Sequence, residues 1–333
     1  MKRLLGWVTG FAALAVAGWF GWAALTERTV QNWLDAREAE GWVVSRRDVT
    51  VAGFPSAFET RIAELSLADP ATGLAWAAPL FIIRHATWDP SRIEAIWPAT
   101  HTVASPFETL TITAQKLQSV LDLRPSAGLA LDALRTEMLD LRIDSSLGWS
   151  SQLAQGRLEM TRQEGSEAHY AIAFEASDLI PATQIARLLD PAGLLPEAIP
   201  IVRSEAMVRF DRPWDISAIE TTRPQPTRID LTEARAEWGA LMLRLSGAVD
   251  IDDQGRPTGE VAIRAQNWPE MLAMAERSGL LPASMRQAAE SALGFLAGLS
   301  GRREDLDVTL RLDQGFVFLG PLPIGEGPRL RLR

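Results

Sequence analysis

The sequence predicts a mainly β protein of the α+β class, in which an N-terminal transmembrane helix precedes long, curved antiparallel sheets with a few short helices. Two observations support this fold class. The chain begins with an uninterrupted apolar run, and from Trp42 onward apolar and polar residues alternate at period two. Pro, Gly, Asp and Ser separate the alternating runs, as expected for antiparallel strands joined by hairpins.

Residues 1–26 have the composition of a membrane anchor. After Met-Lys-Arg, the run from Leu4 to Leu25 carries no charge, and at about 1.5 Å per residue it spans roughly 30 Å as a helix. Lys2 and Arg3 are expected to stay in the cytoplasm, which places the rest of the chain on the far side of the membrane. The sequence therefore predicts a single-pass protein of the bacterial inner membrane, with the bulk of its chain in the periplasm.

Three tryptophans of the anchor, Trp7, Trp19 and Trp22, lie toward its two ends, where indole rings favour the membrane–water interface. The alternative is a cleaved signal peptide, since Gly21-Trp22-Ala23 has the small-x-small form of a weak cleavage site. The uncharged run is longer than the ~7 to 15 residues of a usual signal core, which favours an anchor. Both interpretations export the domain.

Residues 27–41 are expected to form a juxtamembrane helix, because Trp33 and Leu34 follow Val30 at helical spacing and Gly41 ends the pattern.

Two strand-rich regions follow the juxtamembrane helix. They cover residues 42–178 and 179–333, and the second contains a helical insertion at 269–299. The pattern leaves open whether they form one continuous sheet or two domains. LDALRTEML is the one stretch among the early strands where a helix remains possible, and the regular Arg-Leu alternation at the C-terminus predicts a last strand docked into a sheet.

A corner interrupts the first strands at Gly53-Phe54-Pro55. Glycine tolerates backbone conformations that other residues avoid, and proline removes a ladder donor, so the ribbon can turn or bulge while Phe54 stays packed. One interpretation is a corner that shapes the mouth of a groove, and the simpler one is an ordinary strand connection.

Several stretches, in this order along the chain, resemble one family. They are the anchor, a helix ending in Gly41-Trp42, the strands around Gly53-Phe54-Pro55, Glu237-Trp238-Gly239 before LMLRLSGAVDIDDQGRPTGEVAIRAQNW, and the terminal DQGFVFLGPLPIGEGP. Over almost the whole chain this set is similar to the alphaproteobacterial domain of unknown function family numbered 2125. The resemblance implies an exported, membrane-anchored envelope protein with no assigned activity. More distantly, an anchor followed by long amphipathic strands is similar to AsmA-like envelope proteins, whose curved sheets present a hydrophobic groove associated with lipid handling.

The sequence assigns no catalytic, cofactor-binding or metal-binding residue. The three histidines, His85, His101 and His169, have no second His at a metal-binding spacing. His85 and His101 flank a Trp-rich stretch, so a joint site in space stays open, although isolated strand histidines are the simpler interpretation. Gly148-Trp149-Ser150-Ser151-Gln152 lacks the second Gly of a nucleophile elbow, and there is no phosphate-cradling loop.

Acidic residues suggest turns and not a metal site. DIDDQGRPTGEV begins like a calcium loop at Asp250, but Gln254 and Val261 replace two ligands, so a polar hairpin turn is expected. The acidic pairs Asp252-Asp253 and Glu304-Asp305 are typical of solvated turns. An enzyme and a cofactor are therefore not expected.

Composition narrows the partners. The chain has no Cys, which excludes disulfides, thiolate metal sites and lipidation on Cys, and its net charge of −9 makes a nucleic-acid partner unexpected. The sequence is rich in indole groups, which could line an apolar groove or fill the core of a broad sheet. Outside the anchor these are Trp33, Trp42, Trp76, Trp88, Trp97, Trp149, Trp214, Trp238 and Trp268.

Two functions follow from these patterns. The first is a membrane-anchored, non-catalytic module that binds a lipid or another amphiphilic envelope component in a hydrophobic groove. The second is an envelope scaffold that holds a protein partner and has no ligand pocket. An exported hydrolase has the least support, because it would need a Ser or Asp clustered with one of the three histidines.

Overall fold

The computed structural model describes residues 2–125, 128–184, 186, 195–239, 241–277, 286–287, 290–291, 294 and 305–332. Within these ranges, the side chains of residues 2–13, 270–271, 274–275, 277 and 305 are outside the description. The side chains of Lys2, Arg3 and Trp7, predicted to mark the membrane interface, therefore lie outside it.

Antiparallel strands make up most of the described chain, which confirms the mainly β fold class. The strands are β1 Val43–Ser45, β2 Asp48–Ala52, β3 Ala57–Asp69, β4 Leu74–Ala86, β5 Asp89–Ile96, β6 Thr100–Ala104, β7 Thr109–Thr113, β8 Lys116–Leu123, β9 Leu131–Ser145, β10 Ser150–Arg162, β11 His169–Leu179, β12 Ile199–Phe210, β13 Pro226–Trp238, β14 Leu241–Ile251, β15 Pro257–Gln266, β16 Asp305–Asp313, β17 Phe316–Leu319 and β18 Leu322–Glu326. The helices are α1 Lys2–Ala39, α3 Ser217–Glu220 and α4 Trp268–Arg277.

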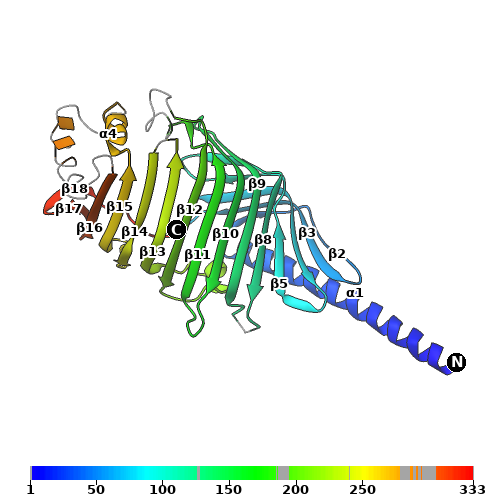
Figure 1. The fold of residues 1–333 in the computed structure, drawn as a ribbon. Coiled ribbons are helices and arrows are strands. Elements are labelled where there is room, and N and C mark those ends of the chain that lie inside the picture. Colours follow the sequence, from blue (N-terminus) through cyan, green and yellow to red (C-terminus); the bar gives the residue numbers. More distant parts are fainter. Residues whose placement is uncertain are drawn as a thin grey trace.

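All of these strands belong to one 18-stranded antiparallel sheet (Figure 1). From β8 onward each strand pairs antiparallel with the next one along the chain. Most of the connections are short, whereas residues 267–304 separate β15 from β16. Before β8 the order is less regular: β3 pairs with β1, β2 and β4, and β4 pairs with both β5 and β6. The sheet runs through residue 179 without a break, since β11 pairs with β12.

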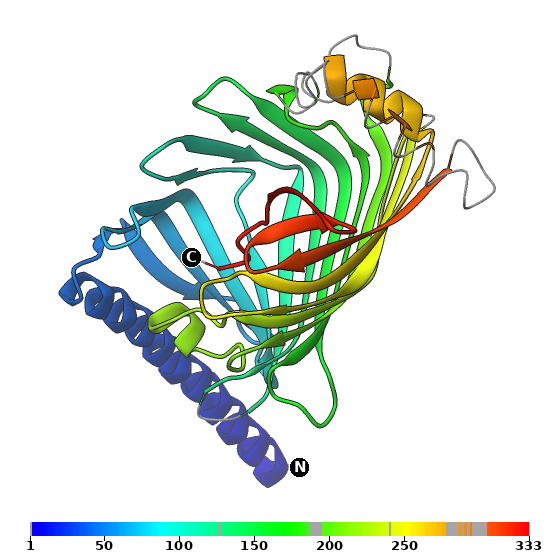
Figure 2. The ribbon, with the colours of Figure 1, turned by 90° about the vertical axis from the view of Figure 1, so that its left-hand side faces the viewer.

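The sheet curls into a trough (Figure 2). Its concave side carries α1, α3 and the C-terminal segment, and its convex side faces outward. Three acidic residues within strands, Glu64, Asp140 and Asp178, take positive φ angles of 52°, 48° and 49°. The regular pairing skips these positions. Such interruptions let a long strand bend, which suits a curved sheet.

Helix α1 runs without interruption through the predicted boundary between anchor and juxtamembrane helix. Its C-terminal half packs on the first strands, where Leu34 lies in a core cluster with Val49, Ile62 and Leu65. Among the helices whose side chains the structure describes, none combines the length and the apolar character needed to cross a membrane. The anchor stays a prediction.

The structure decides one alternative that the sequence left open and corrects one prediction. LDALRTEML, where a helix was possible, lies in β9. The C-terminal segment is not a regular strand: it follows β18, which pairs with β17, and it crosses the concave side, where the Leu330 amide donates to the Gly255 carbonyl at 2.8 Å. Helix α4 covers the start of the predicted insertion at 269–299, and most of the remainder lies outside the described residues.

Candidate functional site

The concave face of the sheet is built from rows of side chains that carry no charge. Because side chains alternate between the two faces of a strand, paired residues on neighbouring strands form rows across the trough. The first row is Val51, Thr60, Ile83, Ala95, Ser119, Thr136, Leu158, Phe174, Ser204, Ala234, Leu245, Ile263 and Val308. At about 4.8 Å between neighbouring strands, this row follows the curved surface for roughly 58 Å.

A second and a third row continue the same surface. The second row is Phe58, His85, Ile93, Leu121, Leu134, Met160, Ile172, Ala206, Leu231, Gly247, Val261 and Leu310. The third is Leu117, Met138, Gly156, Ala176, Val202, Ala236, Leu243, Ala265 and Leu306. No Asp, Glu, Lys or Arg stands in the three rows, so this surface offers contacts mainly to apolar groups.

The middle of the trough remains partly open to solvent. Leu158, Phe174, Leu245 and Ile263 are only half-buried. At the end of the trough where β11 begins and β12 ends, here called the lower end, Tyr170 is fully buried in a cluster with Phe210. Loop residue Trp214 packs on that cluster and so covers the lower end. A sheet face whose apolar side chains lack full burial still has hydrophobic free energy to gain from an occupant.

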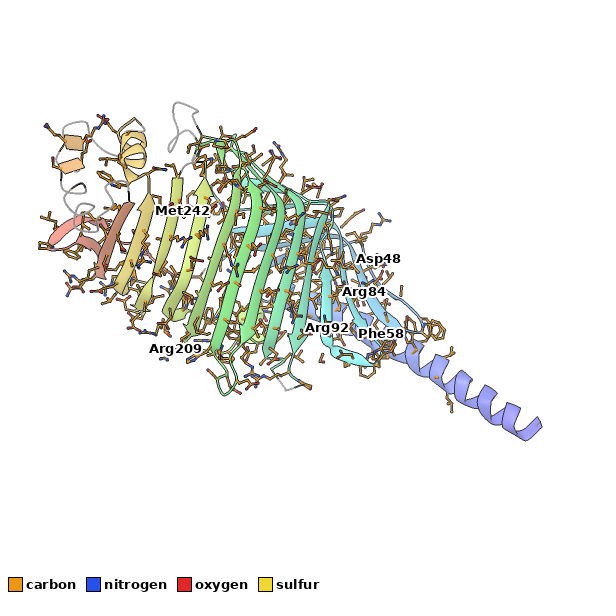
Figure 3. All side chains as sticks on the ribbon, viewed as in Figure 1. Asp48, Phe58, Arg84, Arg92, Arg209 and Met242 are labelled. Carbon is orange, nitrogen blue, oxygen red and sulfur yellow. The ribbon has the colours of Figure 1, made fainter. Side chains whose placement is uncertain are left out.

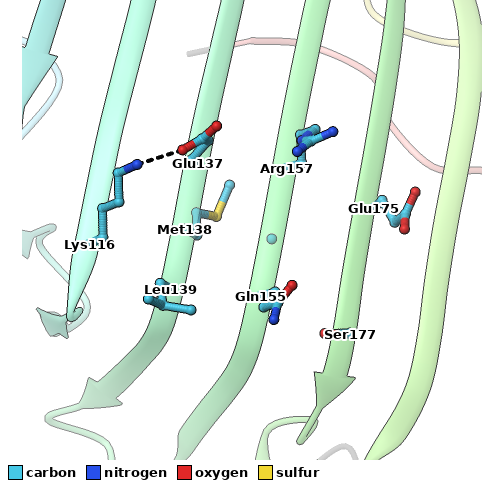
Figure 4. Close-up of a pocket in the computed structure, with 9 residues that line it drawn as sticks. Lys116, Glu137, Met138, Leu139, Gln155, Arg157, Glu175 and Ser177 are labelled. Atoms are coloured by element: carbon cyan, nitrogen blue, oxygen red, sulfur yellow. Dashed lines mark hydrogen bonds and ion pairs between the residues drawn. The ribbon is translucent and has the colours of Figure 1, made fainter.

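The convex face has the opposite chemistry. Figure 4 shows Glu137, Arg157 and Glu175 on three neighbouring strands, with Lys116 ion-paired to Glu137 at 2.6 Å. They line a shallow polar depression of about 400 Å³. Strand alternation has therefore placed these charged side chains on the convex face.

The same row continues with four arginines on adjacent strands, which are Arg203, Arg235, Arg244 and Arg264. Each has an acidic neighbour, respectively Glu205, Glu237, Glu233 and Asp307.

A cleft of about 510 Å³ lies where α1 meets the corner at residues 53–55. Trp19 of α1 is 7% exposed and stacks on Phe58 of β3, with ring centroids 5.0 Å apart and an interplanar angle of 7°. Figure 3 labels Phe58 beside the helix. The lining has no charged side chain: it consists of Ala15, Val16, Gly18, Trp19, Trp22, Phe54, Pro55, Phe58, His85, Thr87 and Pro90.

The backbone of the corner explains its residues. Gly53 has a φ angle of 102°, and a Cβ atom there would lie 2.7 Å from the Ala57 carbonyl oxygen, so only glycine fits. The Phe54–Pro55 peptide bond is cis. The Thr87 hydroxyl donates to the Pro55 carbonyl at 2.8 Å, which ties the corner to the β4–β5 turn.

Residues that the sequence analysis assigned to the anchor and to the corner come together in this cleft. Phe54 lies edge-on to Trp19 at 5.3 Å and stacks on Phe20 at 5.8 Å, and Trp22 and Pro55 complete the lining. Phe58 and His85 line the cleft and also begin the second row, so the cleft and the trough share one apolar surface. The sequence singled out the corner and the anchor separately, but it carried no signal that they touch.

The three histidines do not form one site. His85 faces Phe58, His169 accepts a hydrogen bond from Arg209, and His101 lies among Trp76 and Trp97. Burial lowers the pKa of His101 below its ordinary value, because desolvation disfavours the imidazolium. Among the described residues, no group of three or more His, Asp or Glu is placed to hold a metal ion.

The other tryptophans serve local packing and hydrogen bonds, and no Trp stands in the three rows. The indole of Trp149 donates to Glu108, that of Trp238 donates to the Pro196 carbonyl, and Trp268 is buried beside Leu306. Among the tryptophans whose side chains the structure describes, Trp88 is the most exposed, at 76%. The rows of the trough thus consist mainly of aliphatic side chains, with Phe58 and Phe174 and a few Ser and Thr among them, which the tryptophan count could not indicate.

Residues 250–261 form a hairpin, as expected in place of a calcium loop. Asp252 Oδ1 accepts hydrogen bonds from the backbone amides of Gln254 and Arg256, at 3.0 and 2.8 Å. These amides occupy the carboxylate that a calcium ion would need.

Comparison with known proteins gives one match. The family described as "Uncharacterized protein conserved in bacteria (DUF2125)" matches residues 19–328. No curated protein and no solved structure matches the chain.

Proposed function

Because the chain belongs to the uncharacterized bacterial family DUF2125, we propose a function from its own surfaces: the trough binds the acyl chains of a lipid or another amphiphilic molecule, without catalysis. The observation that carries this proposal is the set of three charge-free rows, half-buried in the middle of the trough. An acyl chain laid there would cover apolar surface at a gain of about 25 cal/mol per Å².

The same proposal places the polar headgroup of the amphiphile outside the rows of the trough. The rows contain few hydrogen-bonding side chains, among them Ser119, Thr136 and Ser204, and the Ser119 and Thr136 hydroxyls already bond each other at 2.9 Å. A charged headgroup would therefore stay at the rim or in solvent, since burying it unpaired is unfavourable. The trough suits chains more than headgroups.

The location proposed with this function is the bacterial cell envelope. Helix α1 contains the apolar run Leu4–Leu25, and the cleft between α1 and the corner lies at the end of the second row. An amphiphile leaving a bilayer beside α1 would meet the cleft first and then the trough. Anchoring in the inner membrane would keep this end of the trough at the source of its ligand.

Photo-cross-linking in intact cells tests the proposal with the full chain. A photoreactive amino acid is placed at Leu245, on the concave face, or at Ser246, which is exposed on the convex face of the same strand. After irradiation, the purified chain is stripped of unbound lipid and weighed by mass spectrometry. We expect an adduct with the mass of a lipid or other amphiphile from position 245 and none from position 246.

A charged substitution in the trough tests the same proposal through the loss of the adduct. Leu245→Lys should abolish the adduct formed from a photoreactive residue at Ile263, its cross-strand neighbour, because an ammonium group excludes an acyl chain. Ser246→Lys is the control and should leave the adduct unchanged. Equal adducts from both faces would contradict the proposal, and a protein adduct from the concave face would favour the envelope scaffold.

A further inference from the structure

Exposed apolar side chains gather around the cleft, outside the trough itself. They come from three separate segments: α1, the corner and the β4–β5 turn. The members of this end patch are Leu14, Val16, Phe20, Trp22, Phe54 and Trp88. Large apolar groups that are exposed together, and not singly, mark a surface that contacts something other than water.

The end patch is joined to the apolar run of the N-terminus. Phe54 stacks on Phe20, and both Phe54 and Phe58 contact Trp19. Trp19 and Phe20 lie inside the uncharged run Leu4–Leu25. From Trp19 to Leu25 the helix rises about 9 Å, whereas each interfacial layer of a bilayer is about 5 to 8 Å thick. If the run occupies a bilayer with Leu25 at the outer edge of the interface, Trp19 and the corner that contacts it lie near the boundary between headgroups and acyl chains.

The chemistry of the end patch fits that depth. The cleft lining has no charged side chain, and on α1 the first charges after the run are Glu27 and Arg28, beyond Leu25. Phe20, Trp22, Phe54 and Trp88 supply the aromatic rings that favour the boundary between headgroups and acyl chains. A soluble protein partner would require no such match between the patch and an uncharged helix that continues beyond it.

We propose that the end patch docks on a lipid surface: the corner at residues 53–55 and the turn carrying Trp88 insert into the bilayer interface beside α1. The sheet then meets the membrane at its β2–β5 end, and its long axis leads away from the bilayer toward β18 (Figure 1). The six exposed side chains of the end patch stand outside the three rows of the trough, so the docking proposal holds even if the trough binds no amphiphile.

Site-directed spin labelling of the full chain tests this docking. Because the chain has no Cys, single-cysteine variants carry one nitroxide each. Trp88→Cys probes the turn, and Phe107→Cys is the control: Phe107 is 81% exposed in the β6–β7 turn. That turn lies at the other end of the same strands, since Ala104 pairs with Ala75 at the start of β4. Both variants are reconstituted in vesicles of phosphatidylethanolamine and phosphatidylglycerol.

Collision with oxygen, which dissolves in lipid, is compared with collision with a water-soluble nickel chelate. We expect the ratio of the oxygen collision rate to the nickel collision rate to be several-fold higher for the label at position 88 than for the label at position 107. A label at 88 that is as open to nickel as the one at 107 would overturn the proposal. Should Trp88→Cys disturb the fold, as judged by circular dichroism, Ser56→Cys, exposed next to the corner, gives the same readout.

Discussion

At Gly259 the backbone of β15 approaches its neighbour so closely that a side chain would not fit. A Cβ atom there would lie 2.2 Å from the Ala248 carbonyl oxygen, and φ is 151°. Gly247, on the facing strand, is in the same position toward Glu260. Because backbone atoms surround both sites, the structure cannot yield by moving a side chain.

We therefore expect Gly259→Ala to lower the free energy of unfolding by about 2 kcal/mol, as overpacking typically does. Gly325→Ala is the control, since its added methyl group would meet nothing within 4 Å, and it should change stability by less than about 0.5 kcal/mol. Thermal and urea denaturation of the purified chain measure both. Equal losses in the two variants would contradict the proposed clash.

His101 gives the molecule a pH dependence at the residue scale. It is 5% exposed, its Nδ1 atom has no hydrogen-bond partner among the residues that the structure describes, and burial lowers its pKa. The unfolded chain then binds a proton more readily than the folded one, so this residue's contribution to stability falls as the pH drops below the unfolded pKa of about 6.5. The slope is at most about 1.4 kcal/mol per pH unit.

His101→Phe should remove that part of the acid sensitivity. We expect the difference in melting temperature between pH 7.5 and pH 5.5 to be smaller in the variant than in the natural chain. His169→Phe is the control, because His169 lies on the convex face and its pairing with Arg209 is exposed. An unchanged pH difference in His101→Phe would show that other groups cause the acid sensitivity.

Sequence reasoning succeeded for single residues whose own backbone needs are unusual. Gly53 and Pro55 predicted a corner, and the positive φ angle and the cis peptide bond are found there. It failed for residues whose environment comes from distant segments. The burial of His101 depends in part on Trp76 of β4, the strand that pairs with β6, and the sequence around His101 does not encode that contact.

Helix α1 is held to the sheet by one of its two tryptophans near the cleft. Trp19 is buried on Phe58, whereas Trp22 is 55% exposed. We expect Trp19→Ala to lower the free energy of unfolding by about 3 kcal/mol, as truncation of a buried aromatic side chain does. Trp22→Ala should leave it within about 0.5 kcal/mol. Denaturation of both variants under the same conditions decides this, and a comparable loss for Trp22→Ala would contradict the assigned packing.

Strands and helices could be predicted where apolar residues recur along the sequence at a clear period. Alternation at period two identified most strands, because each strand buries one face only. The stretch LDALRTEML fits both periods, so its place in β9 was decided by pairing with β8 and β10. The Arg-Leu alternation at the C-terminus indicated a strand, but Gln225 meets that segment instead: its side-chain amide bonds the Leu332 carbonyl at 2.9 Å and the Leu332 amide at 3.0 Å.

For the molecule as a whole, α1 and α3 tie two distant parts of the sheet together. The Arg37 guanidinium donates to the Glu220 carbonyl at 3.1 Å, and the Trp33 indole donates to the Glu220 carboxylate at 3.2 Å. Helix α1 packs on β1–β3, while α3 lies between β12 and β13. These contacts join α1 to α3, and we expect them to limit how far the two parts of the sheet can separate.

Arg37→Ala should loosen this tie. With spin labels at Thr50→Cys on β2 and Arg223→Cys after α3, both exposed, we expect the distance distribution to broaden when Arg37 is replaced. Arg47→Ala is the control, since Arg47 pairs only with the exposed Glu64 in the described structure. Pulsed double-resonance spectroscopy measures the distances. A distribution as narrow as that of the natural chain would show that the two contacts are not needed.

The sequence could predict that an apolar surface exists, but not how far the charge-free surface extends. The alternation implied one apolar face per strand, but whether those faces join across residue 179 depends on the β11–β12 pairing, which no motif records. The cleft was equally hidden, since Phe20 and Phe54 belong to segments that were interpreted separately. Tertiary contact, and not local pattern, creates both.

The pairing order from β8 to β18 also has a consequence for how the chain acquires its structure. Each strand there pairs with its predecessor, and most of the connecting segments are short, so loop closure costs little entropy at those steps; the longest connection is the one of 38 residues between β15 and β16. We expect folding to advance from the N-terminal side as successive hairpins become available, before synthesis is complete. Chains truncated after residue 251, at the end of β14, should keep their earlier strands protected from hydrogen exchange; uniform loss of that protection would show that the last strands are needed from the start.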